Sequence, residues 1–484
     1  MERPGPTSPG PDSADPESRA SERSPQAFRL GSSRHSRSVL PSSPHILRSG
    51  LPLAVAALFS IGCGGDGGSP VGKEFPRPTN LVLLCVDTLR WDHLGTYMPA
   101  DERDPDASPS IDRLADQSVV FEEAIPQASW TLPSFAAILT STLASANGCK
   151  DLESRLPESF TTFPELFQRA GFDTFGVASH IFFRPEYGLQ QGFDGYDASL
   201  AHKRGEEGWI PLSSPHVAKR AIEFLDAHAV GTDAKPFLLF VHDFDPHIPY
   251  YDHDGVGVDP STEHARYRAE IRYTDRFIGR ILDAIESNGL AESTVVCFLS
   301  DHGEAWEEHP GVRRHARSLF REELQVPFFL RVPGIEPRRV GRMVRMVDVM
   351  PTLLELFGIE PGPDRMEGVS LVPLLLGREV EIPPLVAKIE LHPDQHHRRA
   401  IADDRWILIE TQAGTWLLFD RREDPGETRD VAAEHPDLVA EMRAELDALQ
   451  ARARAEGASH EGAAAVELAP EDAQQLEDIG YGGK

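Results

Sequence analysis

Short apolar runs alternate with longer amphipathic stretches along most of the chain. The runs predict buried strands at 80–86, 118–121, 173–178, 237–241, 294–300 and 326–332. Apolar residues at helical spacing predict helices at 133–142, 163–170, 214–227 and 265–287. Because strands that alternate with helices usually form a parallel sheet covered on both faces, the pattern predicts an α/β fold with a mostly parallel central sheet.

The pattern changes after Gly358. Residues 361–378 are rich in Pro and Gly, and β-like stretches follow at 385–391, 399–410 and 415–419. An amphipathic helix is predicted at 436–455, with an apolar face formed by Val439, Met442, Leu446 and Leu449. We therefore expect a catalytic domain at 78–378, a small C-terminal α+β subdomain at 379–456, and a linker with a C-terminal tail at 457–484.

The N-terminal residues are typical of an exported bacterial lipoprotein. Residues 1–45 are rich in Ser, Pro and Arg, and Arg48 then precedes a short apolar run at 51–61. The run is too short to cross a membrane, and residues 60–63 resemble a lipobox in which Cys63 becomes the lipidated first residue. The prediction is a disordered leader and signal peptide at 1–62, a flexible tether at 63–77 and a lipid anchor in the cell envelope; the alternative is an ordinary apolar segment with a chance cysteine.

The net charge of the chain limits the kinds of partner and substrate that it can bind. The chain has 484 residues, 40% of them hydrophobic, and a net charge of −29. Such acidity excludes a typical nucleic-acid partner, which would need a basic surface. An anionic substrate would need a locally positive site built from a metal ion, Arg or His.

Two predicted strands end in residues that can bind a metal ion. Asp87 follows the first strand, with Arg90 close behind, and Asp301 and His302 follow the strand at 294–300. Open α/β sheets bind ligands at the carboxyl ends of their strands, so Asp87, Asp301 and His302 are candidate metal ligands and Arg90 a candidate anion contact. For Asp87 alone, the alternative is a helix cap.

Thr131 stands just before Pro133, which suits the first turn of a helix. We expect Thr131 at the helix N-cap or one residue before it. Its hydroxyl, beside a divalent metal ion, can ionise and attack an ester. The alternative is a hydroxyl that only caps the helix.

Further histidines and arginines lie where strands and loops meet. His242 and His247 follow the strand at 237–241, and His315 and Arg317 belong to a locally basic loop in a very acidic chain. His247 can act as a general acid for the leaving oxygen or hold an anionic oxygen. The alternative for the basic loop is a solvated segment without a ligand.

Taken together, these segments resemble the sulfatase family of the alkaline-phosphatase superfamily across about residues 78–430. The ordered segments are PTNLVLLCVDTLRWDHLGTY, SPSIDRLADQSVVFEEAIPQASWTLPSFAAILTS, DPHIPY, YTDRFIGRILDAI, SDHGE, HARSLFREELQVPFFLRVPG, VDVMPTLLELFGI and FDRREDPGETRDVA, and the terminal LEDIGYG looks like the tail of bacterial members.

The resemblance implies an alkaline-phosphatase-like fold and a divalent ion (Ca²⁺, Mg²⁺, Mn²⁺ or Zn²⁺) held by Asp87, Asp301 and His302, with Thr131 at the metal. It also implies that His247 and His315 handle the leaving group and the substrate oxygens. Arg90, His242 and Arg317 are the candidate substrate-binding residues.

Two departures from the family pattern affect the expected chemistry. Thr131 holds the position of the Cys or Ser that becomes formylglycine, and Phe135 replaces the Arg of Cys-x-Pro-Ser-Arg, so no formylglycine is expected. Residues 176–180 align with the family's Gly-Lys-Trp-His segment without matching it. A Thr nucleophile with this metal set resembles phosphoethanolamine transferases and lipoteichoic acid synthases, which carry membrane helices.

The sequence therefore predicts a metal-dependent hydrolase of sulfate esters at the cell envelope. Two alternatives stay open. One is a phosphoester hydrolase or phosphotransferase that uses Thr131 as its nucleophile. The other is a non-catalytic binding protein on the same scaffold, although such a protein has no need to keep Asp301, His302 and His247 together.

Overall fold

The computed structural model describes residues 77–201, 212–231, 235–253, 261–389, 398–460 and 462–482. All of them fall in the second of two units, which comprises Asp66–Lys484. The predicted leader, lipobox and Cys63 lie outside the described residues. Among the helices within these ranges, none has both the length and the apolar character needed to cross a bilayer.

The core of the fold is an eight-stranded sheet whose strands follow the order β10-β2-β9-β6-β1-β5-β3-β4. β9 runs antiparallel to both of its neighbours, whereas the other neighbouring pairs are parallel, so the predicted mostly parallel sheet is confirmed. The strands are β1 (Asn80–Val86), β2 (Val119–Ile125), β3 (Asp173–Ala178), β4 (Gly195–Asp197), β5 (Phe237–Asp243), β6 (Thr294–Leu299), β9 (Val326–Arg331) and β10 (Arg338–Arg345).

Two strands and part of a third lacked an apolar run in the sequence. β4 has only three residues, and β10 (RRVGRMVR) is an edge strand in which arginines interrupt the apolar residues. β2 continues to Ile125, beyond the predicted end at Phe121. The hydrophobic pattern missed this part because Glu122 and Glu123, which are half-buried in the strand, interrupt the apolar run. These strands are held by pairing to their neighbours more than by their own hydrophobicity.

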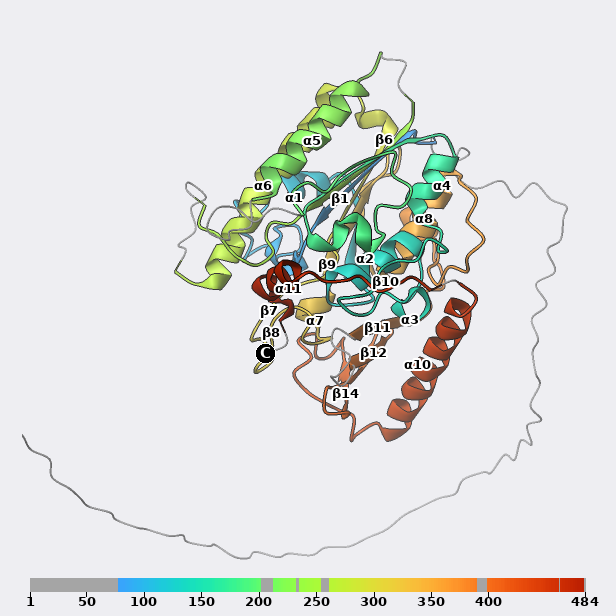
Figure 1. The fold of residues 1–484 in the computed structure, drawn as a ribbon. Helices are drawn as coiled ribbons and strands as arrows, with labels where there is room; N and C mark the ends of the chain where they lie inside the picture. The colour runs from blue at the N-terminus through green and yellow to red at the C-terminus, as the bar shows by residue number, and fades with distance from the viewer. Residues whose placement is uncertain are drawn as a thin grey trace, which may run out of the picture. The chain divides into compact units, whose positions relative to one another are not determined.

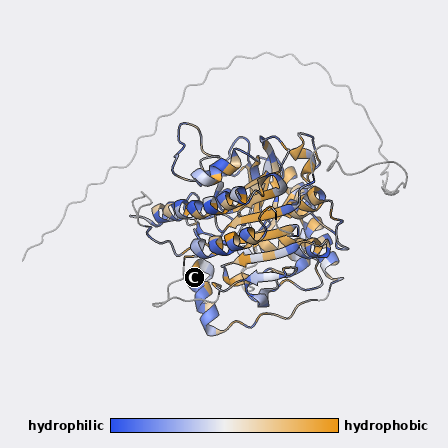
Figure 2. Cartoon of the chain, turned by 90° about the horizontal axis from the view of Figure 1, so that it is seen from above, coloured by the Kyte–Doolittle hydropathy of each residue, from blue (hydrophilic) through white to orange (hydrophobic). Residues whose placement is uncertain are grey.

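Helices cover both faces of the sheet, as predicted (Figure 1). Side chains of β1 alternate between two cores, with Leu81, Leu83 and Cys85 on one side and Val82 and Leu84 on the other. The first core receives α2 (Thr131–Thr140), α4 (Phe163–Arg169) and α8 (Val349–Phe357). The second receives α1 (Pro109–Ala115), α5 (Ser214–Ala227) and α6 (Glu263–Ser287), and the apolar strands between the helix layers are visible in Figure 2.

The C-terminal subdomain is an antiparallel sheet of β11 (Leu385–Ile389), β12 (Arg398–Ala402), β13 (Trp406–Glu410) and β14 (Trp416–Asp420), covered by α10 (Pro436–Gly457). The predicted single stretch 399–410 is wrong in one respect: it forms two strands, because the polar residues 403–405 make a turn. Met442 and Leu446 of α10 pack on one face of the sheet, and the other face joins the first core.

The C-terminal tail packs on the large domain. Helix α11 (Pro470–Leu476) continues into η7 (Glu477–Tyr481), where Ile479 and Gly480 leave the helical conformation, and Leu476, Ile479 and Tyr481 are buried in the first core. In Figure 1 α11 lies beside the loop that carries β7 (Ala305–Trp306) and β8 (Arg313–Arg314). The remaining short elements are η1 (Trp91–His93), α3 (Ala144–Asn147), η2 (Ile181–Phe183), η3 (Pro185–Tyr187), η5 (Ala291–Ser293), α7 (Arg321–Leu324), η6 (Met346–Asp348) and α9 (Val372–Leu375).

Candidate active site

The carboxyl ends of two neighbouring parallel strands bring three of the predicted metal ligands together, and a third strand adds the predicted substrate-binding residue His242. Asp87 follows β1, and Asp301 and His302 follow β6, which pairs with β1. His302 Nε2 lies 3.5 Å from Asp87 Oδ1 and 3.6 Å from Asp301 Oδ2, and all three residues are completely buried. On the other side of β1, His242 of β5 places its Nε2 3.5 Å from Asp87 Oδ2.

Thr131 is the first residue of α2, not its cap. The helix therefore begins two residues earlier than the sequence indicated, because Pro133 needs no intrahelical partner in the first turn. Trp130 is the N-cap, and no side chain caps this end. The Thr131 hydroxyl instead lies 3.3 Å from His302 Nε2 and 3.1 Å from the Tyr481 hydroxyl. The plain capping role is thus not what the structure shows.

The residues Asp87, Asp301 and His302 fit a divalent cation. Neither carboxylate oxygen of Asp87 or of Asp301 has a hydrogen-bond partner. Burial, followed by the charges of Asp301 and Glu304, raises the pKa of Asp87 well above its usual value. Paired buried carboxylates without partners are costly unless a positive charge neutralises them. One atom from each residue lies within 4.8 Å of the others, and oxygens plus one imidazole suit Ca²⁺, Mg²⁺, Mn²⁺ or Zn²⁺.

The hydrogen bonds of the histidine rings distinguish candidate metal ligands from candidate anion contacts. His302 Nδ1 lies 3.0 Å from the Gly303 carbonyl oxygen, so Nδ1 carries the proton and Nε2 presents its lone pair to a metal. His180 shows the reverse arrangement, because its Nδ1 accepts the Phe182 backbone N–H at 3.1 Å. A neutral His180 then carries its proton on Nε2, and burial followed by the neighbouring His247 lowers its pKa well below the usual value.

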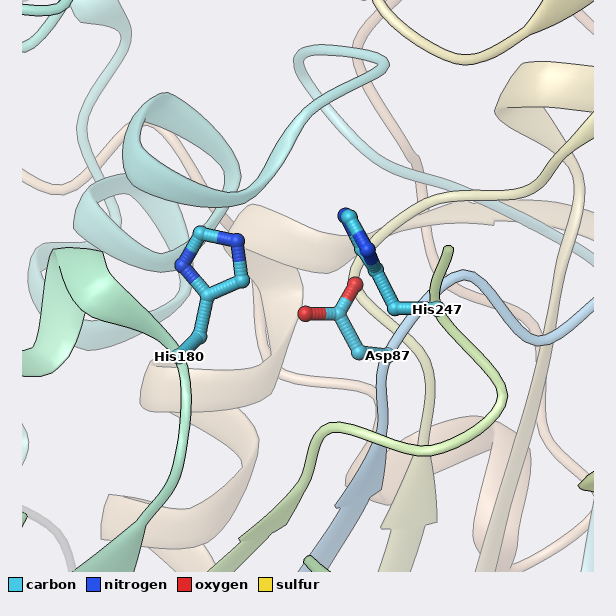
Figure 3. Close-up of side chains that lie close together, drawn as sticks. All are labelled: Asp87, His180 and His247. Carbon is cyan, nitrogen blue, oxygen red and sulfur yellow. The ribbon is translucent and has the colours of Figure 1, made fainter. Parts of the chain in front are cut away.

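Asp87 also forms a second compact group with His180 and His247, shown in Figure 3, where the carboxylate lies between the two rings. A metal ligand cannot carry a proton on the nitrogen that binds, so His180 is better suited to donate to an anionic oxygen than to complete this second metal site. His180 was absent from the predicted site residues. The available signal was a histidine two residues after the end of the predicted strand at 173–178.

His247 and His315 lie next to each other, with ring centroids 4.6 Å apart, and His315 also lies beside His302 and Tyr481, the two residues that contact Thr131. His247 Nδ1 donates to the Ile248 carbonyl oxygen at 2.8 Å, and His315 Nδ1 lies 3.1 Å from Glu304 Oε2. Both Nε2 atoms are buried without a partner, and burial lowers both pKa values well below the usual range. The structure thus brings the two predicted acid–base histidines into the site, and it adds Glu304, from the same SDHGE motif, as the residue that orients His315.

The three predicted substrate-binding residues all contact other parts of the protein. Arg90 donates through Nε and Nη2 to Asp92 and through Nη1 to the Glu304 carbonyl oxygen and Glu308. An anion at Arg90 would compete with two carboxylates. Arg317 Nη2 donates to the carbonyl oxygens of Gly480 and Gly482 in the tail, at 3.2 and 2.9 Å.

His242 packs against Phe183, with ring centroids 4.3 Å apart, and burial lowers its pKa to about 3. It is therefore a neutral ring that supports Asp87. In these contacts Arg90, His242 and Arg317 reach other parts of the protein, and their predicted contact with substrate stays a prediction.

Tyr481 is the site residue that sequence reasoning missed entirely. It reaches Thr131 from the other end of the chain and is 1% exposed. Its ring contacts those of Phe182 and His315, with centroid distances of 5.2 and 5.1 Å. The resemblance of LEDIGYG to bacterial tails was the available signal, and it gave no position in space.

Relatives of known name are similar to most of this chain. An ulvan-active sulfatase of Formosa agariphila is 25% identical over 423 residues, which cover 77% of this chain and 81% of that protein. Human N-acetylgalactosamine-6-sulfatase is 26% identical over 365 residues, covering 64% of this chain and 68% of that protein.

Solved structures share the fold. Ps i-CgsB in complex with k-i-k-neocarrahexaose superposes with a TM-score of 0.66 and 20% identity, covering 78% of this chain and 93% of that chain. The phosphonate monoester hydrolase of Agrobacterium radiobacter gives a TM-score of 0.65 and 19% identity, covering 78% and 96%. This likeness agrees with the predicted alkaline-phosphatase-like architecture.

Two protein families match this chain, one over the large domain and one over a region that includes the C-terminal subdomain. A family described as N-sulphoglucosamine sulphohydrolase, C-terminal, matches residues 314–452. The sulfatase family matches residues 79–359, which is more than half of the chain and includes Asp87, Thr131, Asp301 and His302. The chain belongs to the sulfatase family.

Proposed function

We propose that this protein hydrolyses sulfate esters with the help of one divalent metal ion held by Asp87, Asp301, His302 and Thr131. The observation that carries the proposal is the convergence of the Thr131 hydroxyl with unpaired carboxylate oxygens and unpaired imidazole nitrogens in one buried place. A bound metal ion would supply positive charge next to the sulfuryl oxygens, which are otherwise repelled by Asp87 and Asp301. The reaction consumes water and yields an alcohol and inorganic sulfate.

We assign the binding of an ester oxygen and the protonation of the leaving group to different histidines. His180 Nε2–H is available to donate to an ester oxygen, as its Nδ1 is already taken by the Phe182 N–H. His247 and His315 have their Nδ1 atoms fixed and their Nε2 atoms free, an arrangement in which one ring can deliver a proton to the leaving oxygen. Because relatives are named for sulfated sugars or polysaccharides, we extend the proposal to a sulfated saccharide.

A substrate panel tests this function. The purified protein is expected to hydrolyse an aryl sulfate and a 6-O-sulfated amino sugar faster than a matched phosphate monoester or phosphodiester. A chelator should abolish the activity and added metal should restore it, because two buried carboxylates remain uncompensated without a cation. Release of sulfate and phosphate is measured by ion chromatography. No turnover of any ester by metal-loaded protein would favour the non-catalytic binding protein.

One observation favours a second candidate, phosphoester hydrolysis or phosphoryl transfer. Thr131 supplies a single hydroxyl at the nucleophile position, where the family's defining enzymes use formylglycine. Phosphoryl groups are transferred readily through a single oxygen nucleophile in metal sites. Faster release of phosphate than of sulfate in the same panel would establish this second candidate.

We further propose that the protein is exported and anchored to the bacterial cell envelope through Cys63. The support is the sequence Arg48, the apolar run 51–61 and the lipobox-like ending at Cys63. Cys63→Ser is expected to move the protein from the membrane fraction to the soluble fraction, because it removes the lipidated side chain. Fractionation and intact-mass measurement check this, and an unprocessed wild-type protein that begins with Met1 and stays in the cytosol would contradict it.

A further inference from the structure

The active site is closed in this structure. Thr131, Asp87 and His302 have no exposed surface, and His247 is 2% exposed. The C-terminal segment 470–482 contributes Tyr481, whose hydroxyl lies 3.1 Å from that of Thr131. Because Thr131 has no exposed surface, an ester that reaches it must displace some of the groups around it, and among the described residues Tyr481 is one of them.

A few side chains hold the C-terminal segment in place. Arg317 donates to two of its carbonyl oxygens, those of Gly480 and Gly482, and Arg184 donates to Asp472 and Gln475. The two Arg317 bonds therefore lie on either side of Tyr481, whose hydroxyl is 3.1 Å from that of Thr131.

Gly480 allows the segment to turn into the site. Its φ is +100°, a conformation that L side chains rarely adopt, and a β-carbon built there would lie 3.5 Å from His315 Cε1. The turn therefore places the backbone against a catalytic histidine and directs the next residue, Tyr481, to Thr131.

The direction of the hydrogen bonds follows from the His302 tautomer. His302 Nδ1 donates to the Gly303 carbonyl oxygen, so Nε2 accepts. Thr131 can donate to Nε2, at 3.3 Å, only while that nitrogen binds no metal ion. With a metal ion on Nε2, a Thr131 oxygen that has lost its proton could only accept, and the Tyr481 hydroxyl, at 3.1 Å, is placed to donate to it.

We propose that residues 470–482 form a strap that closes the active site, and that the Tyr481 hydroxyl is a positioning group that donates a hydrogen bond to the Thr131 oxygen. This role deepens the proposed function and rests on it for its effect on turnover. A donated hydrogen bond fixes the position of the oxygen and stabilises the negative charge that develops when the hydroxyl loses its proton.

Tyr481→Phe in the full chain tests the hydroxyl alone. Its kcat on the best substrate of the panel is expected to fall by about 10- to 100-fold, while KM changes by less than about threefold, since the hydroxyl contacts the nucleophile and not the substrate. The matched control is Tyr187→Phe, which removes another buried tyrosine hydroxyl, one that has no hydrogen-bond partner. The control is expected to keep kcat within about twofold. Unchanged kcat in Tyr481→Phe, or an equal loss in the control, would overturn the positioning role.

Hydrogen–deuterium exchange tests the strap without any turnover. Amides of 470–482 should be protected in the wild type, and they should exchange about tenfold faster in Arg317→Met, which loses both bonds to the strap. Equal exchange in the two proteins, or complete exchange of the wild-type segment within seconds, would overturn the strap. A wild type that is inert on every ester but has a protected 470–482 segment would refute the proposed function and still support the closure.

Discussion

Thr131→Ala is expected to lower turnover by at least about a thousandfold while the fold and most of the bound metal persist. The hydroxyl lies 3.3 Å from His302 Nε2, and it plays no part in capping the helix. Asp87, Asp301 and His302 remain to hold the ion in the variant. Loss of the two hydrogen bonds should cost about 1–2 kcal/mol of stability, because two buried polar groups lose a partner.

Thr131→Ser is the matched control, since it keeps the oxygen and loses only a methyl group. It is expected to retain roughly a tenth or more of wild-type turnover, because a freer side chain holds the oxygen less firmly. Steady-state kinetics and metal analysis of the three proteins check both variants together. Near-normal turnover by the alanine variant would eliminate the nucleophile role and leave a metal-activated water as the attacking group.

Thr131 also determines how a covalent intermediate on the enzyme can be released. A formylglycine hydrate attacks as a gem-diol and afterwards expels the sulfate by C–O cleavage, a route that needs a second oxygen on the same carbon. Thr131 has one oxygen, so a sulfated or phosphorylated Thr131 must be released by water that attacks sulfur or phosphorus. A slow substrate should therefore leave a covalent adduct on Thr131 of the wild type, visible by peptide mass spectrometry and absent from Thr131→Ala.

The grouping of the candidate metal ligands could be predicted from the sequence because each lies at the end of an apolar strand. Asp87, Asp301 and His302 follow strands that are recognisable from local hydrophobicity, and parallel pairing of β1 with β6 brings strand ends together in any sheet of this class. The central sheet was predictable for the same reason. β10 was not, because an arginine-rich edge strand gains its conformation from pairing with β2.

The roles of the surrounding groups depend on contacts between residues far apart in the chain, which local patterns do not contain. Arg90 and Arg317 are both cations near the site, yet one contacts carboxylates and the other contacts carbonyl oxygens of the tail. Tyr481 is 350 residues from Thr131. The proton position on His180 depends on a single backbone N–H, that of Phe182. The roles of these residues therefore follow from the folded structure and could not be predicted from local sequence patterns.

Asp301→Asn is expected to weaken metal binding by at least about tenfold and to lower turnover by at least about a hundredfold. The variant keeps the size of the side chain but removes one of the buried charges that attract the cation. The matched control is Asp243→Asn. Asp243 is the last residue of β5, the strand on the other side of β1, and it belongs to neither compact group of candidate ligands. Burial, then Asp245, raises the pKa of Asp243 well above its usual value, so a neutral amide is a close replacement there.

The effect of Asp301→Asn on thermal stability, relative to the wild type, should have opposite signs with and without metal. In the metal-free protein Asp301→Asn is expected to unfold at a higher temperature than the wild type, because Asp87 and Asp301 repel each other in a buried place. In excess metal the order should reverse, since binding stabilises the folded state according to its affinity. Elemental analysis and thermal unfolding, each with and without chelator, measure these effects. Equal metal content in the wild type and Asp301→Asn, together with melting temperatures that metal does not shift, would rule out Asp301 as a ligand.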